Sequence, residues 1–440
     1  MIQGGEFLNE QGQRIKEITV DVRLWKFVRS LDLSQQGQRL AGNEPYLIRS
    51  GPYRELIISQ PEDIHAFYKH DSKNQTKPKN FNFGQKFGRL AGNAVGATYG
   101  DAWRKIRRYF DPPFTTPRVM ENRAAFNVEI RQWIQGIAPA KENFIDPASG
   151  FKLLTFRLLA LHLYGDAFDD RVYWRMLELN DLHENVFQGL LTARWPDSKL
   201  YSYLPTAENR RISDYLRGGG WVCHVESIYR GVDPDIEILE KEFLQTLDEI
   251  LFTNVDVSSK VLSTVFTQLA ANPSIQDALR AEIATYKNDK SLGEAKYVLK
   301  SDTLLHRAVM EGMRMSPAFW FSMPESTAES KKIGGYSIPA NTPVVIDTRR
   351  LNSEAVTWGT DSNSDQFNPD RFLEIPPDRL RCGFMKFGTG AAAGRCLGKN
   401  VADLLFKLTV IVVVEGFGLS CLPGGEKSQE GNGVIRMRRL

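Results

Sequence analysis

Apolar residues recur at spacings of three and four through most of residues 100–313, most clearly in segments 151–164 and 240–271. This spacing gathers apolar side chains on one face and predicts amphipathic α-helices. Segment 240–271 exceeds thirty residues and contains no proline. We therefore expect one long helix that crosses the molecule through its core, and a second apolar helix over residues 399–415.

Short β-type runs lie on both sides of this helical region. Tyr46 to Ser50 and Arg54 to Ser59 flank a Gly-Pro pair and predict a hairpin, and Pro61 follows as the start of a helix. Further short strands are expected within residues 333–348 and at 433–438. Because no repeat or low-complexity linker divides the chain, the predicted fold class is mainly α with a small β-rich region, in one domain over residues 45–440.

Residues 1–44 are set apart as an N-terminal segment. Residues Met1 to Phe7 are typical of a vector-derived leader. The segment contains neither the roughly 20 apolar residues that span a bilayer nor a signal-peptide pattern. We expect the chain as given to be soluble, and we hypothesise that a natural membrane anchor preceded it.

Composition and charge narrow the class of protein. Of 440 residues, 42% are hydrophobic and 25% charged, which is ordinary for a soluble globular protein. A net charge of +3 gives no electrostatic support for nucleic-acid binding. The four cysteines show no CxxC spacing, which argues against a disulfide framework or a zinc site and favours a reducing compartment. Nothing in the sequence requires an oligomer, so we expect a monomer.

Cys396 stands out because it ends a glycine-rich loop that begins at Phe387 and leads into the predicted helix 399–415. Small residues let the backbone wrap closely round a thiolate, and the N-terminus of the following helix favours an anion. Such a sulfur can ligate iron, and heme iron held by a thiolate is primed for O–O cleavage. A cysteine beside glycines is more often a packing residue, so the loop alone does not establish a ligand.

Three other groups are individually weak signals. Glu311 and Arg314 are three residues apart, so they share one helix face and can pair. Arg371 lies in the coil between that helix and the cysteine, and would complete a charge-assisted Glu–Arg–Arg cluster. Trp103 and Arg107 are four apart on another helix face, an aromatic group and a cation suited to a heme propionate.

In this order and spacing, the four groups resemble the cytochrome P450 family of heme-thiolate monooxygenases, from about Tyr46 to the C-terminus. The resemblance implies that Cys396, with Gly398 two residues on, is the axial ligand of a heme b. It implies that Trp103 and Arg107 contact the heme. It also implies O₂ as a substrate and two electrons from NADPH through a reductase. We expect the reductase to dock on a basic face near these motifs, which holds Lys105, Arg108, Lys386 and Lys399.

The residues that follow Cys396 are most similar to fungal members that tailor secondary metabolites. This narrower resemblance implies an N-terminal anchor in the endoplasmic reticulum membrane, with the enzyme on the cytosolic face. The cysteine loop departs from the family, because Gly394 and Thr389 replace the usual cation and phenylalanine, and two residues have been added. We expect Arg395 to reach a propionate and Phe387 to cover the proximal face after local rearrangement.

The long helix also departs from the family at its distal motif. Asp256 falls on the position of the usual acid, but Val257 occupies that of the usual alcohol, with Ser258 after it. Cleavage of the O–O bond requires two protons, which valine cannot relay. Three explanations stay open: Ser258 or a substrate group substitutes, an added water bridges from Asp256, or the substrate is itself a peroxide. Alternatively, Asp256 is an ordinary helix residue with a partner of its own.

The resemblance places several side chains in the distal pocket. We expect about half of them to touch a largely apolar, planar or polycyclic substrate, oriented by a few polar groups. An indole, diketopiperazine, terpenoid or polyketide would each fit. The predicted substrate-binding residues are Phe319, Trp320, Phe321, Phe252, Asn254 and Phe187.

The leading hypothesis is O₂-dependent hydroxylation, epoxidation or oxidative coupling of such a molecule. A heme-thiolate isomerase or dehydratase that consumes a hydroperoxide is the alternative, because a lengthened cysteine loop and a missing distal alcohol both occur in such enzymes. A non-catalytic heme carrier or sensor is a third possibility, but it would leave Asp256 and the pocket without a purpose.

Overall fold

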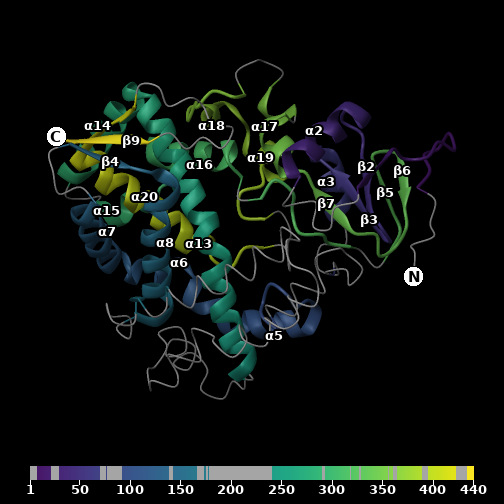
Figure 1. Ribbon diagram of the computed structural model, residues 1–440, viewed down its shortest axis with the longest axis horizontal. Helices are drawn as coiled ribbons and strands as arrows, with labels where there is room; N and C mark the ends of the chain where they lie inside the picture. The colour runs from purple at the N-terminus through teal and green to yellow at the C-terminus, as the bar shows by residue number, and fades with distance from the viewer. Residues whose placement is uncertain are drawn as a thin grey trace.

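A computed structural model of the protein describes residues 7–20, 29–69, 76, 92–137, 142–165, 173–174, 177, 240–289, 293–317, 319–326, 329–354, 356–359, 364–388, 395–422 and 434–440. Helices form most of this part of the chain. Short strands gather in two places, one around β2 and β3 and the other around β4 and β9 (Figure 1). The arrangement confirms the predicted fold class, mainly α with a small β-rich region.

The helices and strands have the following bounds. The α-helices are α2 (Ser30–Ala41), α3 (Pro61–Tyr68), α5 (Gly100–Phe110), α6 (Thr116–Glu121), α7 (Arg123–Ile137), α8 (Pro147–Tyr164), α13 (Glu240–Ala271), α14 (Pro273–Asn288), α15 (Gly293–Leu299), α16 (Leu304–Met315), α17 (Thr348–Ser353), α18 (Arg371–Glu374), α19 (Pro377–Gly383) and α20 (Lys399–Gly416). The part of the chain described above also holds the short 3₁₀ helices η1 (Pro112–Phe114) and η3 (Val356–Trp358). The strands are β1 (Glu17–Val20), β2 (Tyr46–Ser50), β3 (Tyr53–Ile58), β4 (Glu142–Ile145), β5 (Lys331–Ile333), β6 (Tyr336–Ile338), β7 (Val344–Ile346), β8 (Phe417–Cys421) and β9 (Ile435–Arg439).

Helix α13 is the long central helix that the apolar spacing predicts. Its 32 residues span about 48 Å at 1.5 Å per residue. It packs on α8 and α16, and Phe266 stacks on Phe151 of α8 with ring centroids 4.8 Å apart. A Cβ atom at Gly312 of α16 would lie 2.3 Å from Val265 of α13, so a glycine at this position permits the close approach of the two helices.

Helix α20 lies in the interior and starts directly after the cysteine loop. Every residue from Leu404 to Val414 is buried. Even the ammonium group of Lys407 is inside, where it donates to the Val298 carbonyl at 2.8 Å and pairs with Asp403 at 2.8 Å. This packing holds the residues just before α20 in a fixed position. Within the described ranges, no helix combines the length and apolarity that crossing a bilayer requires.

The larger sheet has the strand order β1-β2-β3-β7. Strands β2 and β3 form the predicted antiparallel hairpin, in which Leu47 faces Leu56, while β7 joins β3 in parallel. Gly51 in the connecting turn has φ 58°, a conformation that glycine adopts at little cost. Strands β4, β9 and β8 form a second sheet beside α13, and β5 and β6 form a separate hairpin.

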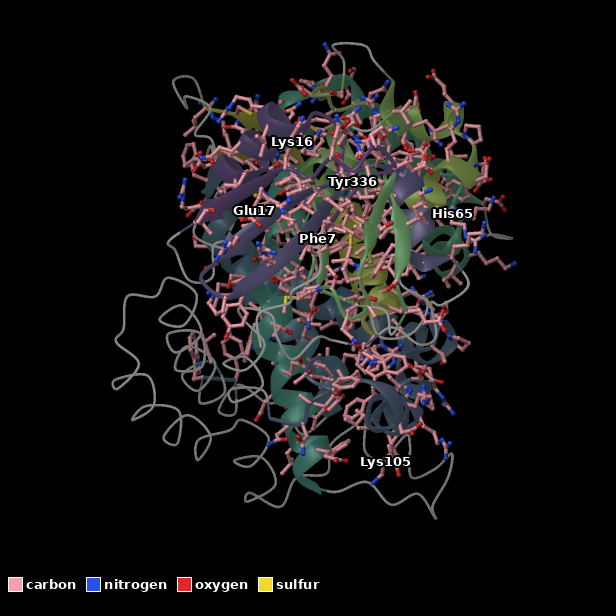
Figure 2. The ribbon with its side chains drawn as sticks, turned by 90° about the vertical axis from the view of Figure 1, so that its right-hand side faces the viewer. Phe7, Lys16, Glu17, His65, Lys105 and Tyr336 are labelled. Atoms are coloured by element: carbon pink, nitrogen blue, oxygen red, sulfur yellow. The ribbon has the colours of Figure 1, made fainter. Side chains whose placement is uncertain are left out.

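The chain before residue 45 takes part in the same packing. β1 pairs in parallel with β2, from Glu17 opposite Leu47 onward. Phe7, which the sequence assigns to a vector-derived leader, is buried in the main hydrophobic core, 4% exposed, in a cluster that includes Tyr336 (Figure 2). The described residues before position 45 are therefore continuous with the sheet and are not a separate appendage.

A buried ion cluster ties the coil before α18 to helix α16. Arg314 donates from Nε and Nη2 to the two carboxylate oxygens of Glu311, each at 2.8 Å, and both side chains are fully buried. Arg371 Nε approaches Glu311 Oε1 at 3.3 Å. Arg314 also donates to the carbonyls of Asn352 and Ser364, so one cluster holds the end of α17, the coil at Ser364 and the start of α18 against α16.

Two buried carboxyl groups make the stability of the fold depend on pH. Burial of Asp347, which caps α17, raises its pKa from the usual 3.8 to about 6, against the opposing effect of the Arg350 N–H. Burial likewise raises the pKa of Asp63 on α3 to about 6. The pKa values of these two groups are higher in the native state than in the unfolded chain, so their protonation stabilises the fold. This stabilisation is fully present below about pH 4 and is lost as the pH rises through about 6.

Between about pH 4 and pH 7, ionisation of Asp347 is expected to lower the free energy of unfolding by roughly 3 kcal/mol, and Asp347→Asn should abolish this fall. The amide cannot ionise, yet its oxygen can still accept from the Arg350 N–H, now 3.1 Å from Oδ1. Urea unfolding followed by circular dichroism across that pH range measures the difference. Asp277→Asn is the control, because that side chain is 77% exposed. Equal pH slopes for Asp347→Asn and the native chain would contradict the assignment.

Candidate functional site

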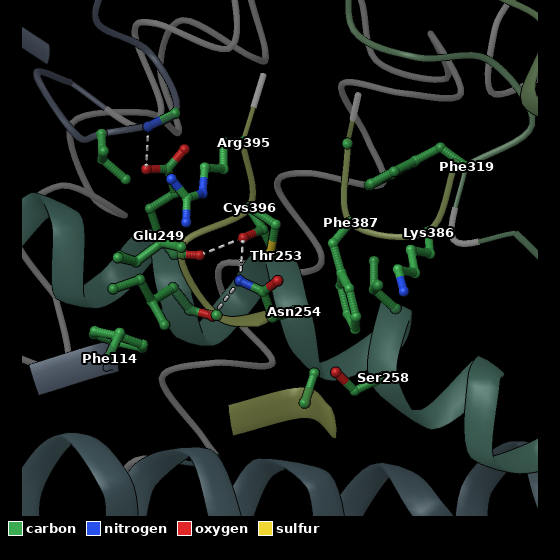
Figure 3. A pocket seen from close by; sticks show the side chains of 18 of the residues that line it. Phe114, Glu249, Thr253, Asn254, Ser258, Phe319, Lys386, Phe387, Arg395 and Cys396 are labelled. Carbon is green, nitrogen blue, oxygen red and sulfur yellow. Dashed lines mark hydrogen bonds between the residues drawn. The ribbon is translucent and has the colours of Figure 1, made fainter. Parts of the chain in front are cut away.

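A cavity of about 370 Å³ lies where α5, α13, the segment 317–323 and the cysteine loop meet (Figure 3). Its wall is largely apolar. Phe114, Leu159, Val261, Met313 and Phe406 contribute from five different parts of the chain. A small number of polar groups interrupt this wall, and those that the sequence singles out include Arg107, Asn254, Ser258, Arg395 and Cys396.

Cys396 forms part of the cavity wall, two residues before Gly398. Its backbone N–H donates to the Phe387 carbonyl at 3.0 Å, so both ends of the lengthened loop meet even though residues 389–394 lie outside the described part. Burial raises the pKa of the Cys396 thiol. The N–H groups of Gly398 and Lys399 and the charge of Arg107 oppose that rise, so they stabilise a thiolate.

Helix α5 brings a tryptophan and a cation to the same cavity. The guanidinium of Arg107 lies 5.3 Å from the ring centre of Trp103, as their spacing of four predicts. Arg107 is 8% exposed, pairs with Asp111 at 2.7 Å and donates from Nη1 to the Arg395 carbonyl at 3.0 Å. α5 is thereby joined directly to the cysteine loop. Arg395 and Phe387 also line the cavity.

One stripe of α13 faces the cavity opposite the cysteine loop. Ile250, Thr253, Asn254, Val257 and Ser258 line it at the three and four spacing of a helix face. Val257 stands in the wall where the family resemblance expects an alcohol. Ser258 is 5% exposed, and Figure 3 shows its hydroxyl among the groups that line the cavity.

The structure corrects the prediction for Asp256, which does not line the cavity. Its side chain is 50% exposed and pairs with Lys152 of α8, with Nζ and Oδ1 3.3 Å apart. A helix turns by about 100° per residue, and the step from Val257 back to Asp256 carries the side chain away from the cavity and toward Lys152 of α8. Asp256 is thus a helix residue with an ordinary partner, which is the alternative that the sequence left open.

The predicted substrate-binding residues divide into three groups. Phe319 and Asn254 line the cavity, and Phe319 is 43% exposed there. Phe321 does not line it, because its backbone bridges Asp347 at the end of β7 and its ring packs in the sheet core. Trp320 also packs against that core, and its ring centre lies 5.8 Å from Lys260 Nζ, so neither of these two residues lines the cavity. The side chain of Phe252 and all of Phe187 lie outside the described part.

Glu249 is a cavity residue that the sequence reasoning missed. Its carboxylate lines the cavity, and Oε2 accepts from the Gly96 N–H at 2.7 Å. Glu249 is eight residues, or about two turns, before Val257, so counting back along the helix face would have found it. The contact with Gly96 also fixes the loop before α5 against α13.

Comparisons with known proteins show what the chain is similar to. A family model described as cytochrome P450 matches residues 232–438. Cytochrome P450 monooxygenase opdB of Penicillium oxalicum is 54% identical over 443 residues, which covers 97% of this chain and 89% of that protein. The corresponding enzymes apdB of Emericella nidulans and lepD of Aspergillus flavus are 41% and 36% identical, and each alignment covers 98% of this chain and 90% and 89% of the relative.

Two solved structures share the fold. Cyanobacterial CYP120A1 with bound retinoic acid superposes with a TM-score of 0.77 at 15% identity, over 99% of this chain and 100% of that chain. CYP175A1 from Thermus thermophilus gives a TM-score of 0.69 at 17% identity, over 97% and 100%. At these identities the similarity is one of architecture alone.

Proposed function

Because the chain belongs to the cytochrome P450 family, we propose that it oxidises a largely apolar small molecule, a fungal secondary metabolite, with O₂ and with electrons from NADPH through a reductase. Membership supports the general class, a heme-thiolate monooxygenase. The observation that carries the proposal is the position of Cys396 in the wall of an apolar cavity, across from a stripe of α13. Such a cavity suits an apolar substrate beside a thiolate-held iron.

The residues at the cavity fit a heme. Cys396 offers the sulfur ligand, and the Gly398 and Lys399 N–H groups and Arg107 favour its ionised form. Arg107 and Arg395 supply guanidinium groups suited to propionates, with Trp103 beside them. When bound, a thiolate-held heme supplies the cleavage of the O–O bond for the oxidation.

Ser258 is the residue best placed to deliver a proton at the distal side. Its hydroxyl lines the cavity one residue after Val257, which has no proton to give. Asp256 is less suited to a water-mediated route, because it is half exposed and paired with Lys152. We expect Ser258 Oγ to donate a proton into the cavity and to regain one from water.

Ser258→Ala is expected to lower the ratio of product to NADPH consumed by about tenfold. This is less than a positioned proton donor typically contributes, because water can occupy the space of the hydroxyl. Ser259→Ala is the matched control, since that neighbouring hydroxyl donates to the Asp256 carbonyl at 3.0 Å and lines no part of the cavity. Val257→Thr should keep or raise the ratio. Equal ratios for the two alanine variants would exclude Ser258 as the donor.

A heme-thiolate isomerase or dehydratase acting on a hydroperoxide is the second candidate. The specific observation in its favour is Val257, which fills the cavity wall at the place expected for the distal alcohol. The hydroperoxide substrate of such an enzyme already contains the oxygen–oxygen bond. The reaction therefore consumes neither O₂ nor NADPH.

Turnover of candidate metabolites, followed by mass spectrometry, tests the proposed function. A monooxygenase consumes NADPH with reductase present, and its product gains an oxygen or loses two hydrogens. An unchanged mass, or the loss of one water, without NADPH consumption would replace the proposal with the isomerase or the dehydratase.

The partner and location complete the proposal. An NADPH-cytochrome reductase would dock beside Lys399, which starts α20 next to the cysteine loop. By analogy with fungal relatives, the native enzyme would act at the cytosolic face of the endoplasmic reticulum membrane.

A further inference from the structure

Asn254 presents a hydrogen-bond acceptor to the cavity and has no hydrogen left to donate. Its Nδ2 donates to the Ile250 carbonyl at 2.8 Å and to Thr253 Oγ1 at 3.1 Å. The Thr253 hydroxyl in turn donates to the Glu249 carbonyl, 2.5 Å away, so its hydrogen is also committed. Both amide hydrogens of Asn254 are thereby used within α13.

These bonds fix the orientation of the amide. Rotating it by half a turn would place Oδ1 against the Ile250 carbonyl, which can only accept, and two acceptors at 2.8 Å repel each other. Among the described residues, none donates to Asn254 Oδ1. The oxygen is therefore held as a permanent acceptor, three residues before Val257 on the stripe of α13 that lines the cavity (Figure 3).

We propose that Asn254 selects substrates that carry an N–H or O–H donor. The donor binds Asn254 Oδ1, and this hydrogen bond fixes the orientation of the substrate relative to Cys396. This inference rests on the proposed function and narrows its substrate class from an apolar molecule to an apolar molecule with such a donor. The surroundings strengthen the selection. In a largely apolar cavity an unpaired acceptor is costly, so a substrate without a donor leaves Oδ1 desolvated and unsatisfied.

Binding of a matched pair of small molecules to the heme-loaded protein tests the proposal without turnover. Carbostyril is a bicyclic lactam with an N–H group, and coumarin is a lactone of nearly the same shape with an oxygen in that place. Isothermal titration calorimetry is expected to give a dissociation constant about three- to tenfold lower for carbostyril, the usual effect of one net hydrogen bond.

Two variants identify the residue responsible. Asn254→Ala and the similarly sized Asn254→Leu should each bring the ratio of the two dissociation constants to about one, and the leucine keeps water out of the vacated space. Thr264→Ala on the outer face of α13 is the control and should keep the native ratio. A native ratio near one, a ratio that survives in both variants, or no binding of carbostyril would overturn the proposal. NADPH-dependent oxidation would stand in each of those cases, so the two proposals fail separately.

Discussion

Replacing Glu311 with alanine is expected to lower the free energy of unfolding by about 3–5 kcal/mol, because it leaves a fully buried guanidinium without its counter-ion. Arg314 is 1% exposed and takes both of its carboxylate contacts from Glu311. The loss extends beyond that pair. Glu311 Oε1 also accepts from the Asn368 N–H at 3.1 Å and from Arg371 at 3.3 Å, so the coil before α18 and the start of α18 lose two of their hydrogen bonds to α16.

Urea unfolding and the heme content of the purified protein measure this effect. Glu311→Gln is the second variant, since it keeps the shape of the side chain but removes the charge, and an intermediate loss is expected. Glu121→Ala is the control, because its pair with Arg118 is about half exposed and worth no more than about 1 kcal/mol. If Glu311→Ala and Glu121→Ala unfold at the same urea concentration, the cluster does not hold the coil in place.

Cys396→Ser is expected to reduce product formation by at least about a thousandfold, or about 4 kcal/mol of barrier, while leaving the fold intact. An alcohol is a poor iron ligand and cannot replace the electron donation of a thiolate. The fold should tolerate the change, because serine is only slightly smaller than cysteine. The hydrogen bond that joins the two ends of the loop is made by the backbone N–H of residue 396, which the substitution keeps. We expect a change in unfolding free energy within about 1 kcal/mol.

Turnover under identical reductase and NADPH concentrations checks this second prediction. Cys421→Ser is the matched control, since Cys421 is exposed at the end of β8 and does not line the cavity. A Cys396→Ser enzyme that keeps a tenth or more of the native rate would exclude the sulfur from the reaction. Loss of folding in Cys396→Ser, seen by circular dichroism, would instead show that the residue has a structural role.

Most of the helices could be predicted because their apolar periodicity extends over many residues. Helix α13 has the bounds that the spacing predicts, and the β2–β3 hairpin follows from Gly51-Pro52 between two apolar runs. The cluster of Glu311, Arg314 and Arg371 also follows from spacing and chain order. A long periodic segment still predicts its helix when single residues break the pattern, and a strong turn signal marks where a hairpin reverses. These two features therefore carry most of the information on secondary structure in a single sequence.

The direction of single side chains could not be predicted in the same way. Asp256 and Val257 are neighbours, and only the packing of α8 against α13 decides that Asp256 meets Lys152 while Val257 faces the cavity. The family resemblance places Phe321 in the pocket together with Phe319. Pairing with the end of β7 turns it into the sheet instead, a long-range contact that no local pattern reveals.

The absorption spectrum of the reduced protein with carbon monoxide tests the central claim, that Cys396 holds a heme iron as a thiolate. We predict a Soret band at the red-shifted position typical of thiolate-ligated ferrous heme, present in Cys421→Ser and absent in Cys396→Ser. A band at the position typical of a neutral ligand in the native protein, or the red-shifted band surviving in Cys396→Ser, would contradict the account.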